Sequence, residues 1–305
     1  MRVYNNILEL IGNTPIIKLN NYEKSNNINA NIYAKLEFYN PGGSSKDRIA
    51  LEMIQNAEER GIIKPEETII VEPTSGNTGI GIALVGKIKG YKVIITMPEN
   101  MSKERVNLLK AYGAEVILTN KLDGMKGSID KANEILNNNR NVFIPSQFTN
   151  ISNVEAHYKT TGPEIWNSMN GKVDIFISTI GTGGTLTGTA KYLKEVKPDI
   201  KIIGVEPEES PMITKGYSGM HGIQGIGANF IPQILDTKLI DEIITVNTKE
   251  AFMGVKNIID AEGIFAGISS GAVIKAIEKL KLKGENVVTI LPDKGERYLS
   301  QNLFD

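Results

Sequence analysis

A lysine at the expected start of a helix is the first residue in this chain that could do chemistry. Lys46 lies in a Gly-rich stretch, Asn40–Arg48, which leads into a segment of helical period through Ile49, Met53 and Ala57. Cations are disfavoured at a helix N-terminus, so this position favours the neutral amine of Lys46, which is the nucleophilic and basic form. A solvated lysine in an ordinary loop is the alternative that the motif alone leaves open.

A second turn carries donors for an anion. Residues Glu72–Gly79 follow an apolar run and open a segment of helical period through Ile80 and Val85. The turn offers hydroxyls, an amide side chain and backbone N–H groups together, which suits a carboxylate. A simple helix N-cap by Thr74 or Ser75 is the alternative.

A third turn, Gly181–Thr185, combines three glycines with two threonines and opens another helical segment. Glycines let backbone amides close on a phosphate, and threonines add donors without charge. A dinucleotide fingerprint would need glycine where Leu186 stands, and the Gly-Lys-Ser/Thr of a Walker A loop is absent. The pattern therefore favours a small phosphomonoester over NAD or ATP, with a purely structural turn as the alternative.

The three turns together describe a phosphate, a nearby amine nucleophile and a partner that carries a carboxylate. Pyridoxal phosphate with an amino acid fits this description. A lysine imine would hold the cofactor, the glycine turn would take its phosphate, and its ring would withdraw electrons.

The composition excludes several other kinds of site. The chain has no cysteine and only two histidines, His157 and His221, which we interpret as structural or surface residues. Thiolate nucleophiles, disulfides and Cys-based or multi-histidine zinc sites are therefore excluded. A carboxylate-rich magnesium or calcium site stays open on composition alone, but we predict no metal.

Charge and hydropathy point to a protein of the cytoplasm. There are 34 basic and 35 acidic residues, with no long basic cluster, so a nucleic-acid partner is not expected. No apolar run approaches the ~18 residues of a membrane span. The stretch Met1–Pro15 carries Glu9 within its apolar part and lacks the design of a secretory leader.

The elements that must position these turns alternate between strands and helices, an order typical of parallel sheets covered on both faces. Strands are predicted at Asn31–Glu37, Thr68–Glu72, Lys92–Met97, Glu115–Thr119, Asn141–Ile144, Asp174–Ser178, Lys201–Glu206, Ile240–Val246 and Asn286–Leu291. Among the helices, Ser102 is predicted to cap one that stops at Gly113, and Thr248 to open another.

A chain of 305 residues predicts two domains at about 150 residues each. We assign residues 42–145 to a smaller N-terminal α/β domain, and residues 1–41 plus 146–305 to a larger, cofactor-binding α/β domain. The prediction is an α/β fold of two doubly wound domains with mainly parallel sheets. The cofactor is expected in the cleft between them, beyond the carboxyl ends of the strands.

The three turns and several further motifs together resemble those of a known family. The chain resembles the cysteine synthases (O-acetylserine sulfhydrylases) of the fold-type-II pyridoxal-phosphate β-synthase family. Besides the three turns, the resemblance rests on Ile11–Pro15, His157–Trp166, Gln224–Ala228, Gly267–Ala272 and Gly295–Leu299, and it covers nearly the whole chain.

The resemblance implies roles for particular residues. Lys46 is implied to hold pyridoxal 5′-phosphate as an imine and to move the α-proton of the substrate. The other implied cofactor-binding residues are Asn77 for the 3′-oxygen, Gly181, Thr182, Gly183, Gly184 and Thr185 for the phosphate, and Ser269 for the pyridine nitrogen. The implied receptors of the substrate carboxylate are Thr74, Ser75, Gly76, Thr78 and Gln147.

The implied activity is replacement of the β-substituent of a serine-derived amino acid through an α-aminoacrylate intermediate. In the usual reaction O-acetyl-L-serine and sulfide give L-cysteine and acetate. The resemblance also implies a homodimer and a serine acetyltransferase as a candidate partner. Alternatives are L-cysteine as donor with release of hydrogen sulfide and formation of lanthionine or serine, a serine or threonine dehydratase, and a non-catalytic ligand-binding homologue.

Three departures from the family pattern bear on the choice of substrate. Asn229 stands where the family usually has glycine, and a polar side chain there could hold a water or a second amino acid. Lys294 replaces a small hydroxyl residue, and Asn150–Val154 lacks the family's usual prolines. Neutral drift is the alternative explanation for Asn229 and Lys294.

Overall fold

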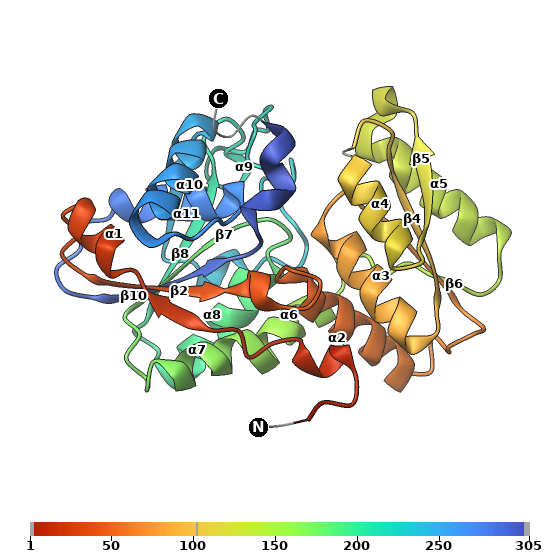
Figure 1. Cartoon of the computed structure of the whole chain (residues 1–305), viewed down its shortest axis with the longest axis horizontal. Helices are drawn as coiled ribbons and strands as arrows, with labels where there is room; N and C mark the ends of the chain where they lie inside the picture. Colours follow the sequence, from red (N-terminus) through yellow and green to blue (C-terminus); the bar gives the residue numbers. More distant parts are fainter. Residues whose placement is uncertain (1–2, 102, 302–305) are drawn as a thin grey trace.

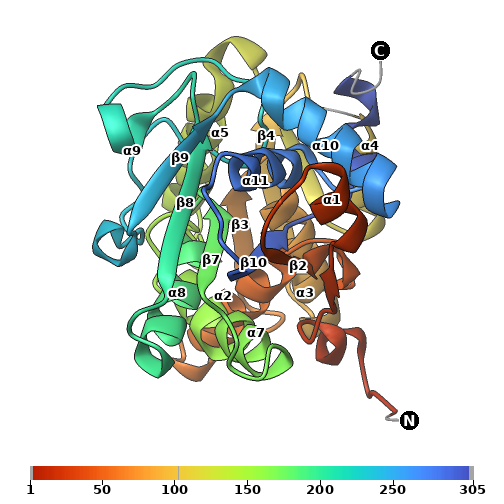
Figure 2. The same ribbon diagram turned by 90° about the vertical axis from the view of Figure 1, so that its left-hand side faces the viewer.

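Two separate sheets, each flanked by helices, make up the molecule (Figure 1). The computed structural model describes residues 3–101 and 103–301. The larger sheet has six strands in the order β1-β2-β10-β7-β8-β9. They are β1 (Ile16–Lys18), β2 (Asn31–Leu36), β7 (Ile175–Thr179), β8 (Lys201–Pro207), β9 (Glu242–Val246) and β10 (Asn286–Leu291). Figure 2 faces this sheet, with β9, β8, β7, β10 and β2 side by side.

The smaller sheet has four parallel strands in the order β5-β4-β3-β6. They are β3 (Ile69–Pro73), β4 (Lys92–Pro98), β5 (Glu115–Thr119) and β6 (Val142–Phe143). In the larger sheet only the edge pair β1–β2 is antiparallel. Every predicted strand is present within a few residues of its expected bounds, so the prediction of an α/β fold with mainly parallel sheets is confirmed.

Helices cover the faces of both sheets. In chain order they are α1 (Asn20–Ser25), α2 (Lys46–Glu59), α3 (Asn77–Lys89), α4 (Lys103–Ala111), α5 (Gly124–Asn138), α6 (Ser152–Ala156), α7 (Gly162–Ser168), α8 (Gly184–Val196), α9 (Met212–Lys215), α10 (Thr248–Glu262) and α11 (Ile268–Glu278). Of these, α2, α3 and α8 begin at the three turns singled out above. Between α6 and α7 lies a π-helical turn, His157–Thr161, and short 3₁₀ turns occupy Ile7–Leu10, Glu37–Tyr39, Lys121–Asp123, Thr237–Leu239 and Gly295–Gln301. The predicted cap Ser102 lies outside the described residues.

The larger sheet is buried on both faces because its strands are apolar on both faces. Along β7, Ile175 and Ile177 belong to the core shared with α10 and α11, whereas Phe176 belongs to the core shared with α7 and α8. Successive side chains of a strand point to opposite faces, so this continuous apolar run supports helices on each side. The described helices include none long and apolar enough to cross a membrane.

Helix α2 connects the two halves of the molecule. Ala50, Ile54 and Ala57 pack into the core of the smaller sheet, whereas Ile49 and Met53 pack against Ala156 of α6. The first residue of α2 therefore lies between the two sheets. All strands of the smaller sheet fall within residues 42–145, but the division into domains at those residues stays a prediction.

Candidate active site

A cavity of about 1070 Å³ lies between the two sheets. Its walls include residues that follow the carboxyl ends of β3, β6, β7 and β10, which is where ligands bind in parallel α/β sheets. Most of the residues predicted from the sequence line it: Lys46, Thr74, Ser75, Gly76, Asn77, Thr78, Gln147, Gly181, Thr182, Gly183, Thr185, Asn229 and Ser269. Gly184 does not line it. The fold thus brings together turns that are more than 100 residues apart.

Lys46 is the first residue of α2 and is half-buried at the cavity wall. Its backbone N–H donates to Ser44 Oγ at 3.2 Å, whereas its Nζ has no hydrogen bond or ion pair to the residues 3–101 and 103–301 that the structure describes. Burial lowers the pKa of Lys46, although Asp293 and Glu37 partly oppose this. The helix start and the burial act in the same direction, so the neutral amine is favoured.

A buried cluster of charges anchors the start of α2 behind Lys46. The Arg48 guanidinium contacts Glu37 at 2.7 Å (Nε to Oε2) and Glu164 at 2.7 Å (Nη1 to Oε1). Lys35 Nζ contacts the other oxygen of Glu164, also at 2.7 Å. Burial would raise the pKa of Glu37, but Arg48 outweighs it and holds that pKa at about 2. The cluster ties α2 to β2 and α7 and fixes the direction from which Lys46 enters the cavity.

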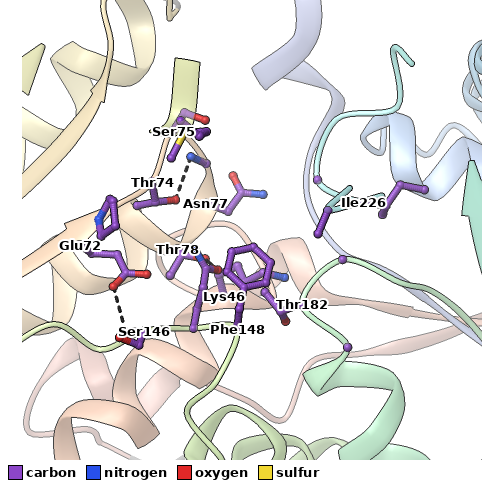
Figure 3. A pocket seen from close by; sticks show the side chains of 18 of the residues that line it. Lys46, Glu72, Thr74, Ser75, Asn77, Thr78, Ser146, Phe148, Thr182 and Ile226 are labelled. Atoms are coloured by element: carbon purple, nitrogen blue, oxygen red, sulfur yellow. Dashed lines mark hydrogen bonds between the residues drawn. The ribbon is translucent and has the colours of Figure 1, made fainter. Parts of the chain in front are cut away.

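The turn after β3 presents its polar groups to the cavity (Figure 3). Thr78 Oγ1 donates to Gln147 Oε1 at 2.6 Å, and the Gly76 N–H donates to Thr74 Oγ1 at 3.3 Å. Asn77, the first residue of α3, donates through Nδ2 to Asp293 Oδ2 at 2.7 Å. The turn is therefore linked both to Gln147 and to the segment that follows β10.

The glycine turn between β7 and α8 has a backbone that only small residues allow. Gly183 adopts a left-handed conformation (φ +86°), and a Cβ there would lie 2.7 Å from the Cβ of Leu235. Gly184 is buried behind the cavity wall as the first residue of α8, and a Cβ there would overlap the side-chain oxygen of Asn153. Packing therefore requires glycine at both positions, and the left-handed backbone requires it at Gly183 as well.

His157 supports this turn from behind. Its Nε2 lies 3.0 Å from Thr185 Oγ1, and its Nδ1 lies 2.8 Å from Thr161 Oγ1. Burial, aided by Arg48, lowers the pKa of His157 to about 3, so the imidazole is neutral. The residue lies under the wall of the cavity and outside its lining, in keeping with a structural role.

Three further polar residues reach this site without having been predicted. Glu72, the fourth residue of β3, is part of the cavity lining. Arg105 of α4 donates to the Ser75 carbonyl at 3.0 Å and to Gln224 Oε1 at 2.9 Å. Asn153 donates to the Gln147 carbonyl at 2.8 Å and to Thr182 Oγ1 at 3.0 Å. Each connects two turns of the cavity wall, and no local pattern in the sequence indicates such long-range bonds.

The three departures from the family pattern lie at different distances from the cavity. Asn229 is part of its wall, in a left-handed conformation (φ +62°) that glycine would also adopt, and its Oδ1 accepts from Ser210 at 3.2 Å. Asn153 belongs to the stretch Asn150–Val154 that lacks prolines, and it bonds to Gln147 and Thr182 of the cavity wall. Lys294 is exposed and lies outside the lining, so nothing in the structure connects it with the choice of substrate.

In the described part of the chain, no three acidic or histidine side chains gather as a metal site would need.

Comparison with known proteins defines the class. A family model described as pyridoxal-phosphate dependent enzyme matches residues 7–293, and the chain belongs to this family. Among its relatives, a cysteine synthase of Staphylococcus aureus is 53% identical over 303 residues, which cover 98% of this chain and 96% of that protein. The predicted resemblance to the cysteine synthases is thus confirmed.

Solved structures agree with this family. A cysteine synthase from Entamoeba histolytica superposes with a TM-score of 0.95 at 44% identity, covering 99% of this chain and 91% of that one. A hydrogen sulfide-producing enzyme from Fusobacterium nucleatum gives a TM-score of 0.91 at 46% identity, covering 97% and 100%.

Proposed function

We propose that this protein is a pyridoxal-phosphate-dependent enzyme of cysteine synthase type, which converts O-acetyl-L-serine and sulfide into L-cysteine and acetate. The observation that carries the proposal is the position of Lys46. This lysine begins a helix at the wall of a large cavity, and burial lowers its pKa. The glycine turn and the turn of hydroxyls and amides line the same cavity. The cysteine synthases among its relatives support the same activity.

The residues present fit pyridoxal phosphate. The turn Gly181–Thr185 precedes and begins a 13-residue helix and contains no acidic side chain, so it offers donors to a phosphate without repelling it. Ser269 lies on the cavity wall in the first turn of α11 and would bond the pyridine nitrogen through a neutral hydroxyl. Asn77 would bond the 3′-oxygen. Pyridoxal phosphate, when bound, supplies an electron sink for the charge that develops at the substrate Cα.

Side chains of this protein would transfer the α-proton and bind the substrate. Lys46 Nζ would take the proton from the substrate Cα and later return it, which requires a neutral amine at working pH. Thr74, Ser75, Gly76, Thr78 and Gln147 would hold the substrate carboxylate through hydroxyls, amides and backbone N–H groups. These donors keep the β-substituent directed into the cavity, where the leaving group departs and sulfide enters.

A second candidate activity is β-replacement in the opposite sense, in which L-cysteine is the donor and hydrogen sulfide is the leaving group. Asn229 favours it, because a polar side chain on the cavity wall can orient a water or a second amino acid where glycine cannot. A relative of known structure is named as a hydrogen sulfide-producing enzyme, which supports testing this candidate.

One experiment separates the two candidates. The purified holoenzyme is assayed for L-cysteine formation from O-acetyl-L-serine and sulfide, and for sulfide release from L-cysteine alone. The proposal expects the first rate to exceed the second. Dominant sulfide release would favour the second candidate, and the variant Asn229→Gly would then be expected to lower that release selectively. A protein with neither activity would refute both.

We further propose that the protein is a cytoplasmic homodimer, with serine acetyltransferase as a candidate partner. These proposals rest on the resemblance to the cysteine synthases. Light scattering of the purified protein, alone and mixed with a serine acetyltransferase, tests the dimer and the complex separately.

A further inference from the structure

A buried carboxylate in the cavity has no part in the reaction proposed above. Glu72 is the fourth residue of β3, is 1% exposed and lines the cavity near its carboxyl-end turn. Figure 3 shows it pointing toward Ser146 on the neighbouring segment, to which it is joined by a hydrogen bond. That segment follows β6 and contains Gln147, one of the proposed receptors of the substrate carboxylate.

The neighbours of Glu72 are hydrogen-bond donors. The Ser146 N–H donates to Glu72 Oε2 at 3.2 Å, and Gln147 is the next residue along the chain. Burial raises the pKa of Glu72 to about 7, although the neighbouring Ser146 and Gln147 act in the opposite direction by favouring the carboxylate. Because the Ser146 N–H donates, an acceptor is needed at Oε2, and an amide NH₂ placed there would face another donor.

The turn held by Glu72 is strained. Ser146 adopts a left-handed conformation (φ +56°), which residues other than glycine rarely adopt. This conformation turns the chain so that the Gln147 side chain is buried and accepts from Thr78 at 2.6 Å. On its other side, the Gln147 carbonyl accepts from Asn153. The bond from the Ser146 N–H to Glu72 therefore opposes the strain at Ser146 and helps to fix where Gln147 lies.

We propose that Glu72 is a positioning residue for the substrate carboxylate: by accepting the Ser146 N–H, it holds the strained turn that places Gln147 beside Thr78. The proposal rests on the proposed function, because the substrate is an α-amino acid there. It predicts that Glu72 contributes to recognition of the carboxylate without contacting it.

The structure offers a matched control. Glu206 is the penultimate residue of β8 in the larger sheet, is 2% exposed, and accepts the N–H groups of Ile213 at 2.9 Å and Thr214 at 3.1 Å. It has the same chemistry as Glu72 at the same end of a parallel strand, but it does not line the cavity. Glu206→Gln therefore removes a buried carboxylate without touching the turn at Ser146.

The first test measures ligand affinity of the holoenzyme through the absorbance of its cofactor. L-serine is compared with ethanolamine, which has the same amine and hydroxyl but no carboxylate. Glu72→Gln should weaken L-serine binding about tenfold, the effect of losing a hydrogen bond to a charged group, and leave ethanolamine unchanged. Glu206→Gln should change neither. Equal loss for both ligands, or no loss for L-serine, would overturn the proposal.

The second test asks whether the strain at Ser146 is what Glu72 opposes. Ser146→Gly allows the left-handed conformation freely, so adding it to Glu72→Gln should restore at least half of the lost L-serine affinity. Ser146→Ala removes the same hydroxyl but keeps the strain, so it should restore nothing. Rescue by both variants or by neither would overturn the proposal.

A third measurement does not depend on the reaction. Hydrogen exchange of the peptide containing Ser146 and Gln147 should be about tenfold faster in Glu72→Gln than in the wild type or in Glu206→Gln. Unchanged exchange overturns the proposal even if the enzyme is active, and faster exchange supports it even if L-serine does not bind the wild type. Glu72→Asp, which keeps the charge on a shorter side chain, serves the same measurements if Glu72→Gln does not fold.

Discussion

The glycine turn proposed to hold the phosphate depends on a contact that one methyl group would destroy. A Cβ at Gly184 would overlap Asn153 Oδ1 and lie 2.5 Å from its Cγ. Asn153 is 1% exposed and donates to the Gln147 carbonyl at 2.8 Å and to Thr182 Oγ1 at 3.0 Å. Its side chain cannot move aside without giving up both bonds. Gly184→Ala therefore acts on the phosphate turn and on Gln147 together.

The size of the effect follows from those two bonds. At about 1 kcal/mol for each hydrogen bond, the loss is about 2 kcal/mol. With 1.36 kcal/mol per factor of ten, Gly184→Ala should weaken binding of pyridoxal phosphate about 30-fold. The assay is titration of the apoprotein with pyridoxal phosphate, followed by absorbance, with circular dichroism to confirm that the variant is folded.

A double-mutant cycle tests the cause. Asn153→Ala removes the same two bonds and also the group that the new methyl would strike. Gly184→Ala should therefore cost little more in the Asn153→Ala background, so that the double variant binds about as weakly as either single one. Additive losses, or wild-type binding by Gly184→Ala, would refute this account of the turn.

Three further predictions concern other contacts. Arg105→Gln removes the guanidinium that joins the Ser75 carbonyl to Gln224. It should lower L-serine affinity about tenfold in the same absorbance assay, and an unchanged affinity would contradict a role for Arg105 in joining these two turns. Glu37→Gln should lower the free energy of unfolding at pH 7 by about 3 kcal/mol, because it leaves Arg48 buried with one partner fewer. Because the folded pKa of Glu37 is depressed to about 2, that stabilisation is present above pH 4.5 and lost as the pH falls toward 2, so wild-type and variant denaturation curves should converge there; a gap that does not narrow would disprove it. Gly271→Ala should destabilise by about 1–3 kcal/mol in denaturant unfolding, since its Cβ would overlap the backbone of α10, and an unaffected midpoint would contradict that packing.

Much of the fold could be predicted from the sequence because its signals are local. Runs such as Asn286–Leu291 are apolar and β-branched, and they form strands wherever a sheet can bury both faces. The strand Ile16–Lys18 was not predicted, since three residues are too short for a periodic pattern and its antiparallel pairing with β2 depends on a distant segment. The turns around Lys46 and Gly183 were found because glycine and charge at a helix start are local features.

The rest of the site could not be predicted because it is made by contacts between distant segments. Glu72 occupies a strand position and accepts a bond from Ser146, 74 positions away, and Arg105 has the spacing of a core residue in a helix. Asn153 lies in a stretch noted only for lacking prolines. None of these side chains has a local pattern that sets it apart, and their function depends on how the sheets are placed relative to one another.

Lys46 is proposed to bind the cofactor and to carry the chemistry. This role can be tested by treating the purified yellow holoenzyme with borohydride and mapping its peptides. We expect one phosphopyridoxyl group per chain, attached to Lys46 Nζ, and none in Lys46→Ala, which should also lose cysteine formation. A label on another lysine, or an unlabelled wild-type protein that still makes cysteine, would contradict it.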